Sequence, residues 1–289
     1  MRFFKKIDLF ITMTANPNWD KITWKLFPGQ MSYDRPDIVA CVFKLKKEEL
    51  IDNIYKKHIF GHVVAYMYVI EFQKRSLPHI HLLVLEYNTQ LRMLANIDFC
   101  ITAQWPDLRT QPLLFDTVKS TMVHGPCRNL NPSAPCMQNG HCTKGFPKPF
   151  QQTTSTTEDG YPLYACSNNG WSFSVTVSGI GNVKLDNRWI ALYNPYISAK
   201  FHCQTNVESI MTFHTIKYCF KYIHKRPDRA TLKYEHDKIK QYINGWYIGA
   251  SEGMWQILHF GVYKHVPSIK RLQVSTIDLS YVWLCTYLC

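Results

Sequence analysis

Two apolar runs, Val63–Ile70 and Leu82–Leu85, flank the mostly polar segment Glu71–His81, which reads EFQKRSLPHIH. Short apolar runs joined by a few polar residues are typical of two antiparallel strands connected by a tight turn. His79 and His81 lie two positions apart at the start of the second run. Because side chains two apart on a strand point to the same side, the pattern predicts that both imidazoles share one face of a sheet.

The segments before this hairpin predict a strand and then a helix. Leu9–Thr14 is rich in β-forming residues and is followed by Ala15–Asn18, a turn signal. Apolar residues then recur at helical spacing until about His58. We expect Asp34 to cap this helix and Pro36 to occupy its first turn. The predicted order is therefore strand, helix, strand, strand.

The second half of the chain gives weaker patterns. A helix is expected around Leu113–Val123, and short β-like pieces at Tyr161–Cys166 and Trp171–Val177 predict hairpins on one edge of the sheet. We expect a strand near Ala199–Gln204 and a helix from about Glu208 to His224, ended by Pro227. Two further helices are predicted, over Asp237–Trp246 and Ser251–Leu258.

Together these elements predict an α+β fold. We expect a central antiparallel sheet that carries the hairpin in its middle, helices packed on that sheet, and a Cys-rich insertion over residues 120–150. One domain is expected over residues 1–275. The remaining residues 276–289 form an atypical apolar tail, which suggests a truncated or frame-shifted end.

Composition points to a folded protein with a polyanionic partner. The chain has 289 residues, of which 46% are hydrophobic and 14% aromatic, so a sizeable core is possible. Its formal net charge is +12. A basic surface of that size suits nucleic acid, although ordinary solubility charge is the simpler alternative.

Several classes of protein are disfavoured by what the chain lacks. Asp8 and Asn16 bound the N-terminal apolar stretch too tightly for a secretory signal, and no uncharged run has the roughly 18 residues of a membrane span. The phosphate loop of ATPases is absent. An intracellular, reducing setting follows, in which the ten cysteines are expected to be free thiols or metal ligands and not disulfides.

The histidine pair predicts a divalent metal site. Glu71 and Gln73 are the candidates for a third ligand, and an odd loop is required for Glu71 to share the face of His79 and His81. A loop of Arg75–Leu77, for example, pairs Gln73 with His79 and Glu71 with His81. Two imidazoles and a carboxylate suit Mg²⁺ or Mn²⁺ on a phosphate, and the ligand types also admit zinc. The simpler alternative is a pair of ordinary core or surface histidines.

Tyr218 and Tyr222 are four residues apart, so they lie one above the other on the expected helix. A phenol, with a pKa of about 10, attacks a phosphate only when a nearby cation eases its deprotonation. Lys221 and Lys225 lie within one turn and could supply that charge. The alternative is an aromatic stripe at core spacing, but so basic a segment is poorly explained by a buried face.

A loop rich in Gly, Pro and Asn carries a second set of potential ligands. His124 and Cys127 have the H-x₂-C spacing of a zinc knuckle, and Cys136 and Cys142 follow. Three thiols and one imidazole are an accepted structural zinc set. The wider gaps are unusual, so free thiols are the alternative.

Three blocks, in order, resemble the replication-initiator endonuclease domain of Helitron transposases. They are 9–17 (LFITMTANP), Glu71–His81, and 218–225 (YCFKYIHK). The segments 34–40, 127–150 and 267–274 are also similar to that family. The resemblance covers roughly residues 7 to 275.

The resemblance implies an HUH endonuclease, Rep-like fold and a metal-dependent nickase and strand transferase that acts on single-stranded DNA. His79 and His81, with Glu71 or Gln73, would hold the ion. Related viral initiators have a carboxylate eight residues before the first histidine, which favours Glu71. By the same resemblance, Tyr218 or Tyr222 would attack, form a 5′-phosphotyrosine link and free a 3′-OH, with Lys221 and Lys225 beside them. The resemblance also implies residence in the nucleus.

This chain departs from the family in three respects. Ser76 stands where glycine is frequent, and the upstream region and the helicase domain expected as a partner are missing. A second hypothesis is therefore a decayed transposon fragment that binds nucleic acid without cutting it. All the predicted catalytic residues are nevertheless present, which favours retained activity.

Overall fold

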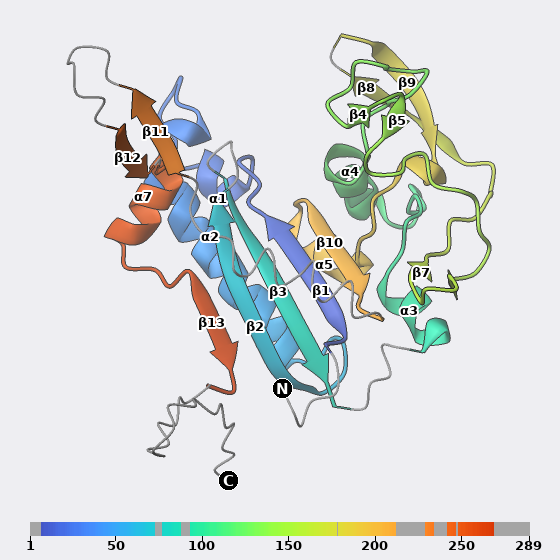
Figure 1. Ribbon diagram of the computed structural model, residues 1–289, viewed down its shortest axis with the longest axis horizontal. Coiled ribbons are helices and arrows are strands. Elements are labelled where there is room, and N and C mark those ends of the chain that lie inside the picture. The colour runs from blue at the N-terminus through green and yellow to red at the C-terminus, as the bar shows by residue number, and fades with distance from the viewer. Residues whose placement is uncertain are drawn as a thin grey trace.

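A computed structural model of the chain describes residues 7–72, 77–87, 93–177, 179–211, 229–233, 242–246 and 248–268. Its centre is a five-stranded sheet in which every pair is antiparallel. The strand order is β10 (Thr205–Ser209), β1 (Leu9–Thr14), β3 (Pro78–Glu86), β2 (Val63–Phe72) and β13 (Tyr263–Val266) (Figure 1). The α+β class and the central position of the histidine hairpin are therefore confirmed.

Helices cover one face of this sheet. They are α2 (Pro36–Ile51), α5 (Pro195–Phe201) and α7 (Ala250–Ile257), and the short α1 (Asp20–Thr23) precedes α2. Alternate residues of the inner strands, such as Ile11 and Leu82, are fully buried in the same core cluster as Phe43 and Trp255 from the helices. Burial of this face supplies the main hydrophobic stabilisation of the domain.

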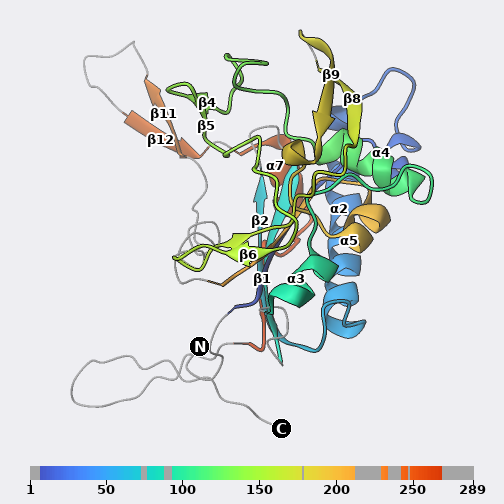
Figure 2. The same cartoon turned by 90° about the vertical axis from the view of Figure 1, so that its right-hand side faces the viewer.

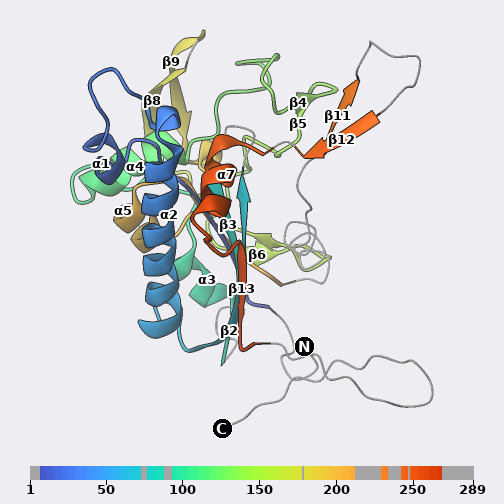
Figure 3. The same cartoon turned by 90° about the vertical axis from the view of Figure 1, so that its left-hand side faces the viewer.

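The other face of the sheet looks away from α2. The small ribbons β4–β5 (Met137–Gln138 and His141–Cys142) and β6–β7 (Ser155–Thr156 and Pro162–Leu163) lie on this side (Figures 2 and 3). A minor apolar cluster of Phe10, Leu83 and Ile210 covers part of it. Glu71, His79 and His81 lie on this second face.

The predicted first strand and first helix are confirmed, but the helix cap is not. Helix α2 begins with Pro36, and Arg35 at the N-cap position makes no side-chain cap hydrogen bond. Asp34 instead ends a 3₁₀ turn, η1 (Ser32–Asp34), where its carboxylate accepts a hydrogen bond from the Met31 N–H. The Asp34 carboxylate therefore caps the start of the 3₁₀ turn and not the start of α2, because the Met31 N–H is the unpaired donor within its reach.

Helix α2 runs directly into η2 (Asp52–Lys56), a π-helical turn, so helical backbone extends almost to the predicted end near His58. His58 has a left-handed backbone, with φ of 54°, and Gly61 has φ of 90°. These two residues turn the chain from the helix into β2. Glycine adopts a positive φ readily, so Gly61 suits this turn, whereas His58 adopts it at a cost.

The region between α3 (Leu94–Cys100) and α5, hereafter the inserted region, contains two small cores. Helix α4 (Pro112–Thr121), which overlaps the predicted Leu113–Val123, contributes to a cluster of Trp105, Phe115 and Tyr193, whereas α3 packs near the main core. A separate cluster joins Cys127 and Phe146 to Trp189 of η4 (Asn187–Trp189). Both clusters sit beside the ribbon β8–β9 (Ser172–Val177 and Gly181–Asp186).

The predicted hairpins exist, but not as edge strands of the central sheet. Pro162–Leu163 pairs with Ser155–Thr156, and Ser172–Val177 pairs with Gly181–Asp186, each as a two-stranded ribbon. Short strands rich in Thr, Ser and Gly bury too little apolar surface to demand a place in a sheet. Their sequence pattern predicts pairing but not the partner.

The predicted strand at Ala199–Gln204 is wrong. Helix α5 extends to Phe201, because Pro195 occupies its first turn and the Asn194 side chain accepts a hydrogen bond from the Ile197 N–H. His202 then ends the helix with a left-handed φ of 48°. The strand follows, as β10.

The helix predicted from Glu208 is wrong at its start. Glu208 and Ser209 belong to β10, where they pair with Phe10 and Leu9. Residues 212–228, and with them the rest of that prediction, lie outside the described residues.

Near the C-terminal end, one predicted helix is confirmed and one is contradicted. Helix α7 matches Ser251–Leu258 within one residue. Within Asp237–Trp246, however, Tyr242–Trp246 forms strand β12, which pairs with β11 (Arg229–Lys233). The β-branched Ile243 and the aromatic ends of β12 favour a strand once a partner is at hand.

The predicted tail at residues 276–289 lies outside the described residues, and the domain boundary at residue 275 stays a prediction. In the part of the chain that the structure describes, none of the helices has the length and apolar character needed to cross a bilayer.

Candidate functional sites: a histidine hairpin and a Cys/His cluster

The register of the β2–β3 hairpin places Glu71 on the face of the two histidines. Glu71 pairs directly with His79, and Val69 pairs with His81. Residues 73–77 form the connection, so the loop is odd, as the shared face requires. The particular pairing given as an example, Glu71 with His81, is not the one observed: the partner of Glu71 is two residues earlier on β3.

Glu71 and His81 are in direct contact across the hairpin. The Nε2 atom of His81 lies 2.8 Å from a carboxylate oxygen of Glu71. Because a carboxylate only accepts, the imidazole N–H donates this hydrogen bond. The same nitrogen and oxygen are the atoms that a divalent ion would bind in place of the shared proton.

His79 is held by the neighbouring strand. Thr14 lies opposite His79 in the β1–β3 pair, and its hydroxyl oxygen is 2.7 Å from Nδ1 of the imidazole. This contact leaves Nε2 of His79 to another partner. A hydrogen bond to one ring nitrogen is the usual way in which proteins orient a metal-binding histidine.

The two imidazoles are close together and largely removed from water. Their ring centroids are 4.5 Å apart, and the Phe10 ring stacks on His81 at 5.7 Å. His81 is only 5% exposed. Burial, together with the neighbouring His81, lowers the pKa of His79 to about 3, although the Glu71 charge opposes the shift. His79 is therefore neutral at physiological pH, the state in which imidazole binds a metal.

A cavity of about 430 Å³ borders the face that carries the histidines. Its lining includes Phe146, Lys148, Tyr161 and Glu208. Glu208 pairs with Phe10, the residue whose ring stacks on His81. The cavity therefore lies between the inserted region and the sheet, near the hairpin site, and Lys148 gives it a basic side chain.

The remaining predicted residues of this first site are not described. Gln73, one of the two candidates for the third ligand, lies outside the described residues, as do Tyr218, Tyr222, Lys221 and Lys225. Their roles stay predictions. Thr14 and Phe10 were missed by the sequence reading, although the alternation in the first strand places both on one face, and only the β1–β3 register reveals which face that is.

The second predicted site is assembled in the structure. His124, Cys127, Cys136 and Cys142 each present one ligand atom, and these four atoms all lie within 4.8 Å of one another. The Sγ atom of Cys142 is 3.5 Å from Nε2 of His124. Three thiols and an imidazole at such distances fit a tetrahedral zinc ion.

The thiols differ in how readily they ionise. Burial, with hydrogen bonds that the Cys127 S–H donates to Cys142 and Cys136, raises the pKa of Cys127 to about 12, and burial also raises the pKa of Cys136. Burial acts in the same direction on Cys142, but backbone hydrogen bonds at Phe146 and Lys144 outweigh it and lower the pKa of Cys142. Cys142 is thus the first thiol of the cluster to carry negative charge.

Aromatic rings fix the position of the ligand His124. Its imidazole stacks on Phe146 with ring centroids 4.2 Å apart and an interplanar angle of 9°. Burial and the nearby Lys148 and Lys144 lower the pKa of His124, which keeps the ring neutral. The ligand histidine is therefore preorganised by packing and charge.

Comparison with known protein families connects the N-terminal part of the chain to Helitrons. Residues 1–84 match the family model described as the Helitron helicase-like domain at N-terminus. The match runs from the start of the chain through most of β3, so it includes Glu71, His79 and His81. It confirms the resemblance over this region and indicates a function related to Helitron transposases. No curated protein matches the chain.

Proposed function

We propose that this chain is a metal-dependent single-strand DNA endonuclease and strand transferase of the HUH type, with a Rep-like fold, acting in rolling-circle transposition. The observation that carries the proposal is the hairpin geometry. The β2–β3 register puts Glu71, His79 and His81 on one face of a central strand pair, with Glu71 and His81 2.8 Å apart. That geometry occurs in the segment that matches the Helitron family model.

The hairpin residues fit a hard divalent ion. Two imidazoles and one carboxylate leave coordination positions open for phosphate oxygens, as Mg²⁺ and Mn²⁺ prefer. When bound, such an ion would draw electron density from a scissile phosphate and make its phosphorus easier to attack. Thr14 orients His79 through Nδ1, whereas Glu71 and His81 would both be ligands of the ion.

In the proposed reaction, the phenol oxygen of Tyr218 or Tyr222 forms a bond to phosphorus and loses its proton. The bond between phosphorus and the 3′ oxygen breaks, and that oxygen leaves as a 3′-OH after taking up a proton. The product is a 5′-phosphotyrosine. One ester replaces another, so rejoining by the second tyrosine needs no ATP. Lys221 and Lys225 are proposed to ease deprotonation of the phenols.

The Cys/His cluster is proposed to be a structural zinc site. Its four side chains would fill all four positions of a tetrahedral zinc ion and leave none for water or substrate. Such a closed set is typical of structural zinc and not of catalytic zinc. Its ligands span residues 124–142, a stretch whose only regular structure is the ribbon β4–β5. Zinc would supply the cross-link that this stretch otherwise lacks.

The proposal is tested by covalent capture. The full chain is incubated with single-stranded oligonucleotides and Mn²⁺, and a protein–DNA adduct is sought by denaturing electrophoresis and mass spectrometry. We expect an adduct on Tyr218 or Tyr222 that is lost with Tyr218→Phe/Tyr222→Phe and with His81→Ala. Tyr87→Phe, which changes an exposed tyrosine outside the proposed site, is the matched control.

Binding without an adduct on any sequence, across a library of oligonucleotides, would overturn the endonuclease proposal. That result would favour the second hypothesis, a decayed fragment that only binds nucleic acid. An adduct that survives in His81→Ala would also contradict the account, because it would detach cleavage from the hairpin. Nuclear residence is a separate proposal, tested by imaging a tagged chain in cells.

A further inference from the structure

The inserted region contains a second cavity, of about 190 Å³, that the proposed reaction does not use. Its lining comes from the chain after the Cys/His cluster, from the turn before β8 and from the end of β9. The lining residues that matter here are Phe150, Asn168, Asn169, Trp171, Ser172 and Asp186. Two aromatic rings and several polar side chains thus surround one space, in a region without hairpin residues.

Trp171 is held in place by a series of rings behind it. Its ring lies 6.5 Å from Phe173, which in turn lies 5.1 Å from Trp105 and 4.7 Å from Phe115, measured between ring centroids. Trp105 and Phe115 are buried, whereas Trp171 is 38% exposed. The indole therefore ends an aromatic series that begins in the core and reaches the cavity.

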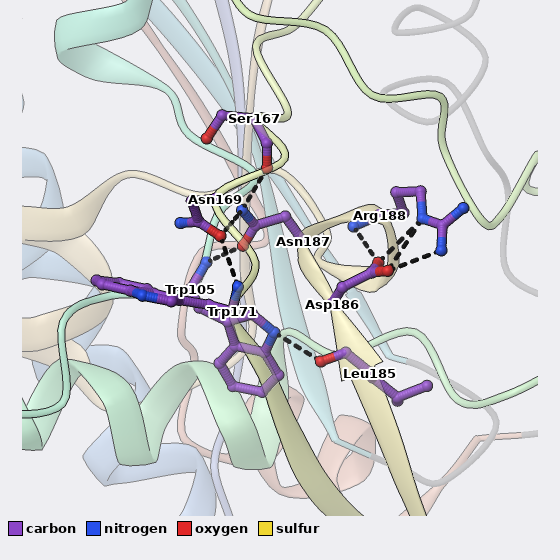
Figure 4. Close-up of polar contacts among 8 residues, drawn as sticks. All are labelled: Trp105, Ser167, Asn169, Trp171, Leu185, Asp186, Asn187 and Arg188. Carbon is purple, nitrogen blue, oxygen red and sulfur yellow. Dashed lines mark hydrogen bonds and ion pairs between the residues drawn. The ribbon is translucent and has the colours of Figure 1, made fainter.

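Phe150, the second ring, is also 38% exposed, and a cation accompanies it. The guanidinium carbon of Arg188 lies 4.6 Å from the centre of this ring. Asp186 fixes Arg188 through a hydrogen bond of 2.7 Å, which raises the pKa of the guanidinium (Figure 4). Arg188 and Asp186 thus form an ion pair beside the Phe150 ring, and the two charges at this border of the cavity are balanced.

The turn between the two rings is rigid. Asn187, 1% exposed, accepts a hydrogen bond of 2.8 Å from the Trp105 N–H and donates one of 2.8 Å to the Ser167 carbonyl (Figure 4). The Asn169 side chain accepts from the Trp171 N–H at 3.0 Å. Gly170 makes this turn possible with φ of 75°, which other residues adopt at a cost.

Two polar side chains of the cavity are available to a ligand. Within the described residues, Asn168 and Ser172 make no side-chain hydrogen bond, and both are exposed. An amide offers one acceptor and two donors in a plane, which matches the edge of a nucleobase. By contrast, the side-chain oxygen of Asn169 and the amide nitrogen of Asn187 are already held by hydrogen bonds within the protein.

We infer that this cavity binds one unpaired nucleobase of single-stranded DNA, stacked against Trp171 and Phe150. Stacking on aromatic rings is the common means of holding single strands, because every base has a π face. The +12 net charge of the chain favours a polyanion over a neutral ligand such as a sugar. The choice of DNA rests on the proposed function, whereas the base-binding geometry does not.

The test uses the full chain and two oligonucleotides of equal length, oligodeoxythymidylate and a version built from abasic residues. Affinities are measured by fluorescence anisotropy over a range of salt concentrations. We expect Trp171→Ala to weaken binding of the oligodeoxythymidylate about tenfold, with an unchanged salt slope, and to leave the abasic strand unaffected. Phe150→Ala should act in the same direction, and Trp171→Phe should restore most of the affinity.

Trp24→Ala is the matched control, since Trp24 is 79% exposed and lies outside the cavity. Thermal unfolding and zinc content establish that each variant is folded. The inference is overturned if Trp171→Ala and Phe150→Ala bind both strands as the unaltered chain does. It is also overturned if they weaken both strands equally, since that result would indicate a lost phosphate contact or a disturbed fold.

Failure of this inference and failure of the proposed function are distinguishable. Tyr218→Phe/Tyr222→Phe, which cannot form an adduct, should still bind the two oligonucleotides and keep the dependence on Trp171. Base-dependent binding without an adduct on any sequence supports the cavity and rejects the endonuclease. An adduct, together with DNA binding that is unchanged in Trp171→Ala and Phe150→Ala, supports the endonuclease and rejects the cavity.

Discussion

The two candidate metal sites are built by different means. The hairpin site consists of side chains on adjacent strands of the central sheet, and backbone pairing fixes their positions: Glu71 lies opposite His79, and Thr14 holds His79 from the other side. The Cys/His cluster gathers His124, Cys127, Cys136 and Cys142 from a stretch whose regular structure is one two-stranded ribbon with two residues in each strand. The sheet can position its ligands without an ion, whereas the loop has little else to hold it together.

This is the difference expected between a metal site that takes part in a reaction and one that stabilises a fold. Ligands fixed by a sheet can leave coordination positions open, because the metal is not required for the fold. Ligands on a loop fold together with their metal, and the binding free energy becomes folding free energy. We therefore expect loss of metal to affect stability at the cluster and activity at the hairpin.

The largest expected effect is loss of zinc. Cys142→Ser should abolish zinc binding and lower the stability of the inserted region by several kcal/mol, since structural zinc contributes about 10 kcal/mol or more in small zinc-binding peptides. Zinc content by mass spectrometry and thermal unfolding measure the outcome. Cys41→Ser, at an exposed cysteine outside the cluster, should change neither quantity. Equal melting temperatures with and without zinc would show that the cluster is only a group of free thiols.

Glu71→Gln should have the next largest effect, at the hairpin. Replacing the carboxylate by an amide removes a charged oxygen ligand and the partner of His81. We expect Mn²⁺ affinity to fall by about a hundredfold while the melting temperature of the metal-free chain changes little. Isothermal titration calorimetry measures the affinity. A variant that binds Mn²⁺ as tightly as the unaltered chain would exclude Glu71 as the third ligand and return the choice to Gln73.

Thr14→Val should produce a smaller loss at the same site. The change removes the hydroxyl that orients His79 and keeps the shape of the side chain. Loss of such an orienting hydrogen bond typically costs 10–100-fold in metal affinity, and we expect about tenfold here. Thr12→Val is the matched control, because Thr12 lies on the same strand and face but opposite His81. Equal losses in the two variants would mean that the effect is one of packing.

The smallest expected effect is in proton release. Zinc binding at the cluster should release protons at pH 7, because the pKa values of Cys127 and Cys136 are raised above their ordinary range. Metal binding at the hairpin, by contrast, should release no proton from His79 above about pH 4, because the pKa of His79 is lowered to about 3. Calorimetry in buffers of different ionisation enthalpy counts the protons, and NMR follows His79. A His79 titration midpoint near 6.5 would contradict the buried, neutral imidazole.

The sequence reading predicted both sites where the ligands follow a simple rule. Alternation along a strand places His79 and His81 together, and the parity of the hairpin loop decides the side of Glu71. The H-x₂-C spacing of His124 and Cys127 similarly indicated the Cys/His cluster that the structure assembles. What the sequence did not provide was the neighbour: Thr14 contacts His79 only because β1 pairs with β3.

The errors arose where local signals compete. The apolar residues of 199–204 suggest a strand, but Pro195 and the Asn194 cap start a helix that continues to Phe201. In Asp237–Trp246 the apolar spacing suggested a helix, whereas Tyr242–Trp246 pairs with a strand some ten residues earlier. Capping and pairing partners decide such segments, and periodicity alone contains neither.

The claim on which the account depends is that Glu71, His79 and His81 hold the ion used in DNA cleavage. The most direct measurement is a crystal structure of the full chain grown with Mn²⁺, with anomalous scattering to locate the metal. The account predicts a peak in contact with His79, His81 and Glu71 on the open face of the sheet. Full occupancy by Mn²⁺ elsewhere, with the His81–Glu71 hydrogen bond intact, would contradict it.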